Sequence, residues 1–522
     1  MTDRTLISRR VRSERGPVFV AGPRRVAVAY PSPYRVGMSS LGYQRVITLM
    51  RRAGIAAERC FLPDDEATRG TGPALTYESS TSLGSFPLIA VSFAYEAELI
   101  GLLQLLQGAG IPARREDRTA QHPRILLGGP IGMASPAFLA DFVDAVLLGE
   151  AEDTVGPAVT AFFDSETNEG WLDAIAALPG GWVPERDGMR FPAISKASDE
   201  HLPARSAWLA PEAELSDMFL IEGERGCHRM CTFCVMRRTT NGGMRLVGPD
   251  RVLALIPEEA RKVGLVGAAI SDHPRLVDLL SVLVDNGRQV SVSSLRADRI
   301  AKRPDIARLL RKSGARTLTT ASDGASERVR KWMSKGTKEE HLLESARQAS
   351  SLGYSTLKLY QMVGVPGEED ADIDELIRFT LEVAQVAKGV RVALGVAPFV
   401  AKRQTPMDGA DFAGIKLVDK RLKRLKRGLK GRAVVRPVSA RWAWLEHELS
   451  QGGPASGAAI AAGLAAGGRF ADYRRALEAV DSATRRPWVL TEGDPSRAAT
   501  PESPARTRSP APLPRPGPAS SK

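Results

Sequence analysis

The chain has 522 residues, a net charge of +12 and 43% hydrophobic residues. This length suggests about three domains, and the basic charge favours anionic partners without indicating a fold. The sequence has only four cysteines, which excludes a disulfide framework and indicates a reducing compartment. No apolar run approaches the ~20 residues of a membrane span, and residues 1–22 lack a secretory apolar stretch. We therefore expect a soluble cytoplasmic protein.

Short apolar runs alternate with helical patterns in the first third of the chain. Residues 1–23 are rich in Arg and Ser and are expected to be a loose arm. Strands are expected at residues 26–30, 58–62, 88–93, 124–127 and 144–148. The alternation predicts an α/β domain with a doubly wound parallel sheet across residues 24–165. Ligands of such sheets bind at the carboxyl ends of the strands, which here fall at residues 30–38, 93–96, 128–133 and 149–152.

Three of the four cysteines, Cys227, Cys231 and Cys234, lie in one short polar loop. The loop follows a connecting segment, residues 166–215, and an expected strand at residues 218–222. Thiolates select zinc, cuprous copper or iron–sulfur clusters. A closed zinc site needs four ligands, usually in two pairs, and the sequence has no second pair. A cubane iron–sulfur cluster with one open iron therefore fits better than zinc. A redox thiol pair, or buried cysteines that pack as small hydrophobes, would also be compatible with the spacing.

Beyond the cysteine loop the alternation of strands and helices resumes. After residues 218–222, strands are expected at residues 264–270, 289–294, 316–320, 356–361 and 390–396. These six strands and their helices predict a partial barrel, two strands short of the eight-fold form. In such barrels the chemistry collects at the carboxyl ends of the strands, and the cysteine loop lies at one of them.

The spacing Cys-x3-Cys-x2-Cys, with the aromatic Phe233 before the last cysteine, resembles the signature of radical S-adenosylmethionine (radical SAM) enzymes. The resemblance implies that Cys227, Cys231 and Cys234 hold a [4Fe–4S] cluster whose open iron binds S-adenosylmethionine. It also implies reductive cleavage to a 5′-deoxyadenosyl radical, with one electron from a flavodoxin- or ferredoxin-type donor. The implied core is a partial (β/α)6 TIM-type barrel across residues 216–405.

The same resemblance assigns further cofactor contacts. Gly267 lies where relatives hold a Gly-Gly-Glu-like segment for the methionine amino group, but the acid is missing there and Asp272 is the nearest one. The other matching segments lie near the ribose, the carboxylate and the adenine of S-adenosylmethionine. Their expected contact residues are Ser294, Arg296, Asp323, Lys358 and Val365.

Residues 34–44 and 128–130 resemble the cobalamin-binding module that precedes the radical domain in one branch of the family. Modules that ligate cobalt use an Asp-x-His-x-x-Gly motif, which is absent here. Two interpretations stay open: cobalamin binds without a protein ligand on its lower face, or the domain has lost the cofactor. With cobalamin, methyl transfer to an unactivated carbon is expected. Without it, sulfur insertion or another radical modification is expected, with RNA among the substrates considered.

Residues 406–485 are expected to form a basic helix and a small helical appendage. Residues 415–430 place apolar residues on one face and Lys and Arg elsewhere, which predicts a packed amphipathic helix with a solvated face. A nucleic-acid footprint is less favoured, because no aromatic residues interleave with the basic ones. Trp442 and Trp444 are expected to be buried, and residues 486–522 to be disordered. The rival function is a non-catalytic metal-binding protein that contacts RNA through this helix.

Overall fold

The computed structural model describes residues 3–237, 243–293 and 295–485, so the predicted tail at 486–522 lies outside the described residues. The chain forms two compact units. The first holds residues up to 228, residues 235–293 and the segment from 448, and the second holds residues 229–234 and 294–447. Both are mixed α/β with parallel sheets, which confirms the fold class at that level. The units cut across the predicted 216–405 core, and the predicted domain bounds stay predictions.

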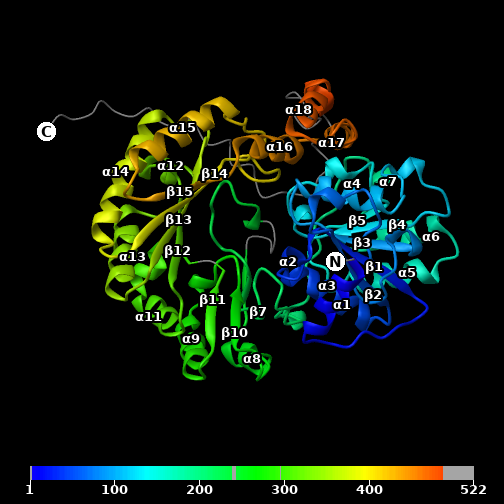
Figure 1. Cartoon of the computed structure of the whole chain (residues 1–522), viewed down its shortest axis with the longest axis horizontal. Helices are drawn as coiled ribbons and strands as arrows, with labels where there is room; N and C mark the ends of the chain where they lie inside the picture. Colours follow the sequence, from blue (N-terminus) through cyan, green and yellow to red (C-terminus); the bar gives the residue numbers. More distant parts are fainter. Residues whose placement is uncertain (1–2, 238–242, 294, 486–522) are drawn as a thin grey trace. The chain divides into compact units, whose positions relative to one another are not determined.

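The first unit contains a six-stranded sheet in the order β2-β1-β3-β4-β5-β6 (Figure 1). Neighbouring strands are parallel except β5 and β6. The five strands expected here are confirmed, and the strand order reverses between β1 and β3, which makes this the point where such sheets bind ligands. The strands are β1 (Arg25–Pro33), β2 (Ala56–Leu62), β3 (Leu88–Ser92), β4 (Arg124–Gly128), β5 (Ala145–Leu147) and β6 (Gly181–Trp182).

Helices cover this sheet because its strands are apolar on both faces, as buried parallel strands are. Val28, Tyr34, Tyr43 and Ile47 belong to one large buried cluster. The segment expected to be only a connector supplies α6, β6 and α7, and β6 extends the sheet. The helices are α2 (Tyr34–Gly37), α3 (Leu41–Arg52), α4 (Glu98–Gly108), α5 (Val155–Asp164), α6 (Asn168–Ala177) and α7 (Pro184–Asp187).

The N-terminal residues differ from the expected loose arm, because residues 3–13 form helix α1 (Asp3–Ser13). Arg10 anchors it: its Nε donates to Glu212 Oε2 at 3.0 Å and its Nη1 donates to the Tyr77 hydroxyl at 2.9 Å. Arg10 also forms an ion pair with Asp64. These partners are distant in sequence, so the composition of residues 1–23 could not indicate the helix.

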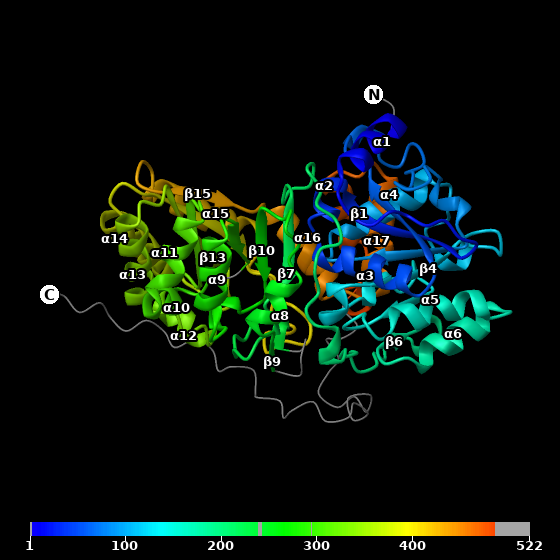
Figure 2. The same cartoon turned by 90° about the horizontal axis from the view of Figure 1, so that it is seen from below.

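The C-terminal helices α17 (Pro454–Ala465), α18 (Phe470–Glu478) and α19 (Ser482–Arg485) belong to the first unit, rather than forming a separate appendage. Helix α17 packs against α4 and against the short turn η5 (Ala137–Leu139) (Figure 2). The β4–β5 connection holds only η5 and η4 (Pro130–Met133) as helical turns. Helix α17 therefore supplies the packing that a crossover helix normally gives.

A substitution at Gly457 can test the close approach of α17 to η5. A Cβ at this position would lie 1.9 Å from the Phe138 carbonyl oxygen. Gly457→Ala is therefore expected to destabilise the first unit by about 1–3 kcal/mol, the usual cost of overpacking. Gly42→Ala in α3 is the matched control, because a Cβ there meets nothing within 4 Å. The control should raise stability by about 0.5–1 kcal/mol. Thermal unfolding followed by circular dichroism measures both, and equal effects would contradict the proposed packing role.

The remaining strands of the first unit carry the cysteine loop. A three-stranded parallel sheet has the order β11-β10-β7, and a two-stranded antiparallel hairpin pairs β8 with β9. The strands are β7 (Met218–Glu222), β8 (Glu224–Gly226), β9 (Met244–Leu246), β10 (Lys262–Val266) and β11 (Gln289–Val292). Helices α8 (Pro249–Ala254) and α9 (Leu276–Asp285) accompany them.

The second unit holds a four-stranded parallel sheet in the order β12-β13-β14-β15. The strands are β12 (Thr317–Asp323), β13 (Thr356–Val363), β14 (Arg391–Pro398) and β15 (Val434–Pro437). The helices are α10 (Ala297–Lys302), α11 (Pro304–Lys312), α12 (Glu327–Trp332), α13 (Glu339–Ser351), α14 (Asp370–Val386) and α15 (Ile415–Gly428). Helix α16 (Ala440–Ser450) follows β15.

Each of the six strands expected beyond residue 215 is present, but they fall in two sheets, so the barrel itself stays a prediction. Strand β15 was missed because it is four residues long and ends in proline. Within the described ranges, no helix combines the length and apolar character that crossing a membrane requires.

Candidate functional site

The candidate site begins with the cysteine loop, residues 227–234, which follows β8. All four cysteines are described and none forms a disulfide. Cys231 is buried, and Cys227 and Cys234 are partly exposed. In the described part of the chain, no three His, Cys, Asp or Glu side chains are grouped as metal ligands are. The fit to a cluster therefore rests on donor chemistry: the loop offers three soft thiol donors, which suit an iron–sulfur cluster.

The hairpin that leads into the loop is held by a buried ion network. Arg225 Nη2 lies 2.8 Å from Glu152 Oε1 and 2.9 Å from Glu222 Oε2, and its Nη1 lies 3.3 Å from Glu150 Oε2. Arg245, opposite Arg225 in the hairpin, also pairs with Glu150. Glu150 and Glu152 follow β5, so the strand end expected to face a ligand instead binds the arginines of this hairpin.

The network holds Glu152 and Arg225 in their charged forms. Burial alone would raise the pKa of Glu152, but hydrogen bonds and charge from Arg225, together with the charge of Arg45, hold that pKa below its usual value. Burial would lower the pKa of Arg225, but Glu222 and Glu152 raise it overall. Since the folded pKa of Glu152 is depressed, its stabilisation is present above the unfolded pKa of ~4.3. It is lost as the pH falls through the lower folded value.

Arg225→Met is expected to lower the stability of the first unit by about 3–5 kcal/mol, because it leaves buried carboxylates without their partner. Arg15→Met is the matched control. Arg15 pairs with Asp217 at 3.2 Å, but its side chain is 55% exposed, so the loss should stay below about 1 kcal/mol. Urea unfolding at neutral pH measures both. Similar midpoints for the two variants would show that the network is not stabilising.

Glu224 is a buried carboxylate directly beside Gly267. It is 1% exposed, and its Oε1 accepts a hydrogen bond from the Ala269 N–H at 2.7 Å. Its Oε2 is buried and has no hydrogen-bond partner. A Cβ at Gly267 would lie 2.2 Å from Glu224 Oε1, so the glycine is required for the carboxylate to sit there. The structure thus places an acid beside the segment where the sequence lacks one.

The surroundings of Glu224 raise the pKa of its carboxyl group. Burial, with smaller contributions from the nearby charges of Glu222 and Asp272, raises its pKa to about 7, against the Ala269 hydrogen bond. Asp272, the acid expected here, lies with its Oδ2 3.7 Å from His228 Nε2. Glu224 was missed because it precedes Gly267 by more than forty residues. The only signal in the sequence was an acid immediately before the Arg-Gly-Cys of the motif.

In the second unit, the rest of the cysteine loop packs on an apolar cluster. Phe233 packs against a buried cluster that includes Val365, Met333 and Phe399. The Thr232 N–H donates to the Met333 carbonyl oxygen at 3.0 Å. The structure therefore brings the predicted residues Phe233 and Val365 together, and Met333 anchors the loop beside them.

Arg296 and Asp323 meet at a segment that sequence analysis missed. Lys335 forms an ion pair with Asp323, and its carbonyl oxygen accepts from Arg296 Nη2 at 3.5 Å. Asp298 Oδ1 accepts from Arg296 Nε at 2.9 Å, and Asp298 Oδ2 lies 3.8 Å from Arg229 of the cysteine loop. Asp323 has φ +62°, an uncommon backbone conformation of the kind that clusters at functional sites.

Two predicted contacts are not supported in this way. Lys358 lies in the middle of β13 rather than at its end, and its Nζ donates to the Tyr360 hydroxyl at 2.8 Å. Ser294 lies outside the described residues. In the first unit its neighbour Ser293, which was not among the predicted contacts, accepts a hydrogen bond from the Gly267 N–H at 3.0 Å.

The carboxyl edge of the six-stranded sheet does not fit a protein-ligated cobalamin. Glu98, at the β1/β3 switch point, accepts from Ser32 Oγ at 3.1 Å and from the Ala94 N–H at 2.6 Å. Both carboxylate oxygens of Glu98 therefore already accept hydrogen bonds from the protein, and burial raises the pKa of Glu98 to about 7. His122 precedes β4, and His201 pairs with Asp153 at 2.6 Å. Neither histidine follows a strand of this sheet.

Comparisons with known proteins match two stretches of the chain to described families. Residues 221–380, which begin at the end of β7 and include the cysteine loop and Val365, match the radical SAM superfamily. The chain carries radical SAM superfamily domains. Residues 42–184 match the family described as radical SAM proteins, N-terminal. The radical SAM family implies a [4Fe–4S] cluster and S-adenosylmethionine as cofactors, the same cofactors that the resemblance of the cysteine motif implied.

Individual relatives are more distant. An uncharacterized protein of Methanocaldococcus jannaschii is 26% identical over 416 residues, covering 77% of this chain and 84% of the relative. Streptococcus suis SuiB bound to S-adenosylmethionine is 14% identical, with a TM-score of 0.31, covering 42% of this chain and 49% of SuiB. Methylornithine synthase is 15% identical, with a TM-score of 0.28, covering 44% of this chain and 68% of the synthase. The chain thus spans about half the length of SuiB.

Proposed function

We propose that the protein is a radical SAM enzyme in which Cys227, Cys231 and Cys234 hold a [4Fe–4S] cluster. The carrying observation is the thiol triad on one loop, inside the residues that match the superfamily. When bound and reduced by one electron from a flavodoxin- or ferredoxin-type donor, the cluster supplies the electron that splits S-adenosylmethionine into methionine and a 5′-deoxyadenosyl radical. The radical then abstracts hydrogen from an unactivated carbon of the substrate.

The protein's own residues would position the cofactor. We assign Glu224 to the amino group of S-adenosylmethionine, because its Oε2 is buried without a partner beside Gly267. A hydrogen bond from a charged donor stabilises a buried carboxylate more than one from a neutral donor, because hydrogen bonds to charged groups are stronger than neutral ones. Glu224 would then take the place of the acid that is missing from residues 266–269.

The test is anaerobic reconstitution with iron and sulfide, followed by iron analysis and an assay for 5′-deoxyadenosine with dithionite as reductant. About four irons per chain and reductive cleavage are expected for a [4Fe–4S] enzyme. Zinc without iron, and no cleavage, would instead favour the rival, a non-catalytic metal-binding protein that contacts RNA.

We infer methyl transfer as the second part of the proposal, with cobalamin as the methyl carrier. The observation in favour is the β1/β3 switch point of the six-stranded sheet, where ligands of this strand order bind. The histidine positions require that cobalamin binds without a protein ligand on its lower face. Purification with hydroxocobalamin, desalting and visible absorption test this. Retained cobalamin is expected, and its complete loss would leave sulfur insertion or another radical modification.

A further inference from the structure

Helix α15 carries its charges on distinct sides. Its apolar residues Val418, Leu422 and Leu425 are buried. A Cβ at Gly428 would lie 2.6 Å from Ile377 of α14, so the two helices lie close together. Three cations of α15 are neutralised by acids in and just before α14. The nitrogen–oxygen distance is 2.9 Å between Arg421 and Glu368, 2.8 Å between Lys420 and Asp370, and 2.6 Å between Arg424 and Asp374.

Other cations of the same region have no acid partner. Within the part of the chain that the structure describes, seven exposed side chains in and just after α15 form no ion pair. They are Lys416, Lys423, Lys426, Arg427, Lys430, Arg432 and Arg436. Lys423 and Arg427, and likewise Lys426 and Lys430, are four residues apart, a spacing at which like charges destabilise a helix. Packing of α14 therefore does not explain these charges.

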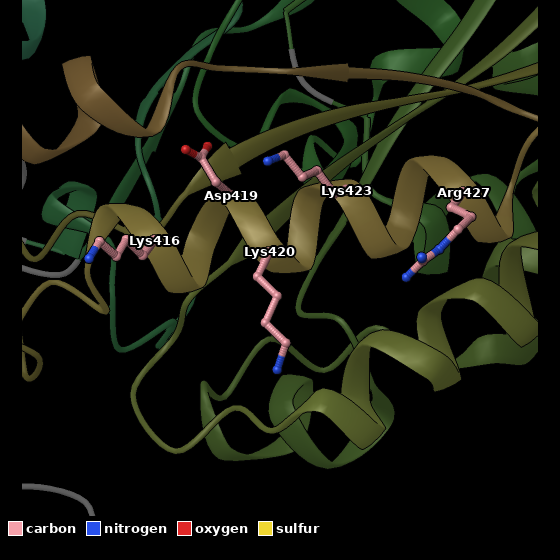
Figure 3. A pocket seen from close by; sticks show the side chains of 5 residues that line it. All are labelled: Lys416, Asp419, Lys420, Lys423 and Arg427. Carbon is pink, nitrogen blue, oxygen red and sulfur yellow. The ribbon is translucent and has the colours of Figure 1, made fainter.

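Four of these seven side chains line two surface hollows: Lys416, Lys423 and Arg427 line the first, and Lys423 and Lys426 line the second. The first, of about 540 Å³, is lined by Lys416, Asp419, Lys420, Lys423 and Arg427, which are spread along α15 (Figure 3). The second, of about 320 Å³, continues from α15 onto residues 437–441. Asp419 is the single acid in either lining. Asp419 and Lys423 line both hollows, so the two hollows adjoin each other on α15.

We propose that this surface, α15 with residues 430–441, binds the sugar–phosphate backbone of nucleic acid. The length of the cationic row decides between a polymer and a small anion. Lys416 and Arg427 are eleven residues apart, about 17 Å along a helix. One strand of that length carries about five phosphate charges, at ~3.4 Å per charge, whereas one free phosphate would engage only one or two of these cations.

The composition also separates nucleic acid from other large anions. Lys is depleted at protein–protein interfaces, while Lys and Arg position phosphate backbones. An amphipathic helix lies on a membrane through an exposed apolar face, and the apolar residues of α15 are buried, so α15 does not offer that mode of attachment.

Trp442 adds an aromatic group to this region. It was expected to be buried, but it is 43% exposed in the first turn of α16. It follows Arg441, which lines the second hollow. The exposed ring can stack on an unpaired base, which residues 415–430 cannot do because none of them is aromatic.

The test is fluorescence anisotropy of fluorescein-labelled oligouridylate with the full-length protein, over a series of salt concentrations. The triple variant Lys423→Gln, Lys426→Gln and Arg427→Gln is expected to bind about tenfold or more weakly. Its plot of log K against log salt should be shallower by about 2, because each lost phosphate contact removes about 0.7 from the slope for a single strand. The wild-type protein keeps the steep slope.

The matched control is Lys302→Gln, Arg316→Gln and Lys388→Gln, which removes the same charge from exposed positions elsewhere in the second unit. It should bind within twofold of the wild-type protein. If both variants weaken oligouridylate binding equally, the effect comes from net charge alone and the proposal is wrong. An absence of oligouridylate binding, including the case where only phosphatidylserine vesicles bind, would also overturn the proposal. Cluster content plays no part in the measurement, so it stands apart from the enzymatic proposal.

Discussion

Cys231→Ala is expected to abolish both the iron–sulfur cluster and the cleavage of S-adenosylmethionine. Cys231 is the middle thiol of the triad and is 8% exposed, so neither solvent nor a neighbouring cysteine can replace its sulfur. Two remaining thiolates do not hold a cubane with a single open iron. Iron and sulfide content, the visible spectrum and 5′-deoxyadenosine formation should all fall to background after anaerobic reconstitution.

Cys60→Ala is the control for this substitution. Cys60 is fully buried in β2, and burial raises the pKa of its thiol to about 12, so it is neither a thiolate ligand nor a reactive thiol at neutral pH. This variant should keep the iron content and the cleavage activity of the wild-type protein. Full cleavage by Cys231→Ala would refute the cysteine assignment. Loss of the cluster in Cys60→Ala alone would place the ligands elsewhere.

The features that the sequence predicted are those that residues close together along the chain determine. Apolar runs such as residues 26–30 and 88–93 identified strands, because buried parallel strands are continuously hydrophobic. The spacing of Cys227, Cys231 and Cys234 indicated a cluster-binding loop, because three thiols this close along the chain can reach one cluster. Phe233 and Val365 were predicted separately as cofactor contacts; the structure packs them in one apolar cluster, and their contact with the cofactor stays a prediction.

The features that were missed depend on contacts between distant segments. Nothing near Arg225 indicates that Glu150 and Glu152, more than seventy residues earlier, neutralise it. Lys335 lies outside every motif, yet it pairs with Asp323. The packing of α17 against η5 joins residues more than three hundred positions apart. Such pairings are selected by the folded geometry, so charge or composition in one segment cannot reveal its partner.

Glu224→Gln is expected to weaken S-adenosylmethionine binding about tenfold to a hundredfold, because it removes a charge-assisted hydrogen bond of about 1.5–3 kcal/mol. The substitution keeps the shape of a side chain that sits 2.7 Å from the Ala269 nitrogen, so folding should be preserved. Equilibrium binding without reductant measures this effect, and it does not require turnover. Unchanged affinity would contradict the assignment while leaving the cluster proposal intact.

The pH dependence distinguishes a binding role from a structural one. The pKa of Glu224 is raised to about 7 in the folded protein, above the ~4.3 of an unfolded glutamate. Its contribution to stability is therefore present below about pH 4 and is lost as the pH rises through about 7. A cationic amino group favours the ionised form, so S-adenosylmethionine affinity should instead increase as the pH rises through about 7.

Both slopes should disappear in Glu224→Gln. The control is Glu98→Gln, because burial also raises the pKa of Glu98 to about 7 but the residue lies at the β1/β3 edge. Glu98→Gln should retain the increase in S-adenosylmethionine affinity with pH. If the affinity of the wild-type protein does not depend on pH between about 6 and 8, Glu224 does not contact the amino group. If Glu98→Gln also loses the slope, the dependence arises from the fold and not from the cofactor contact.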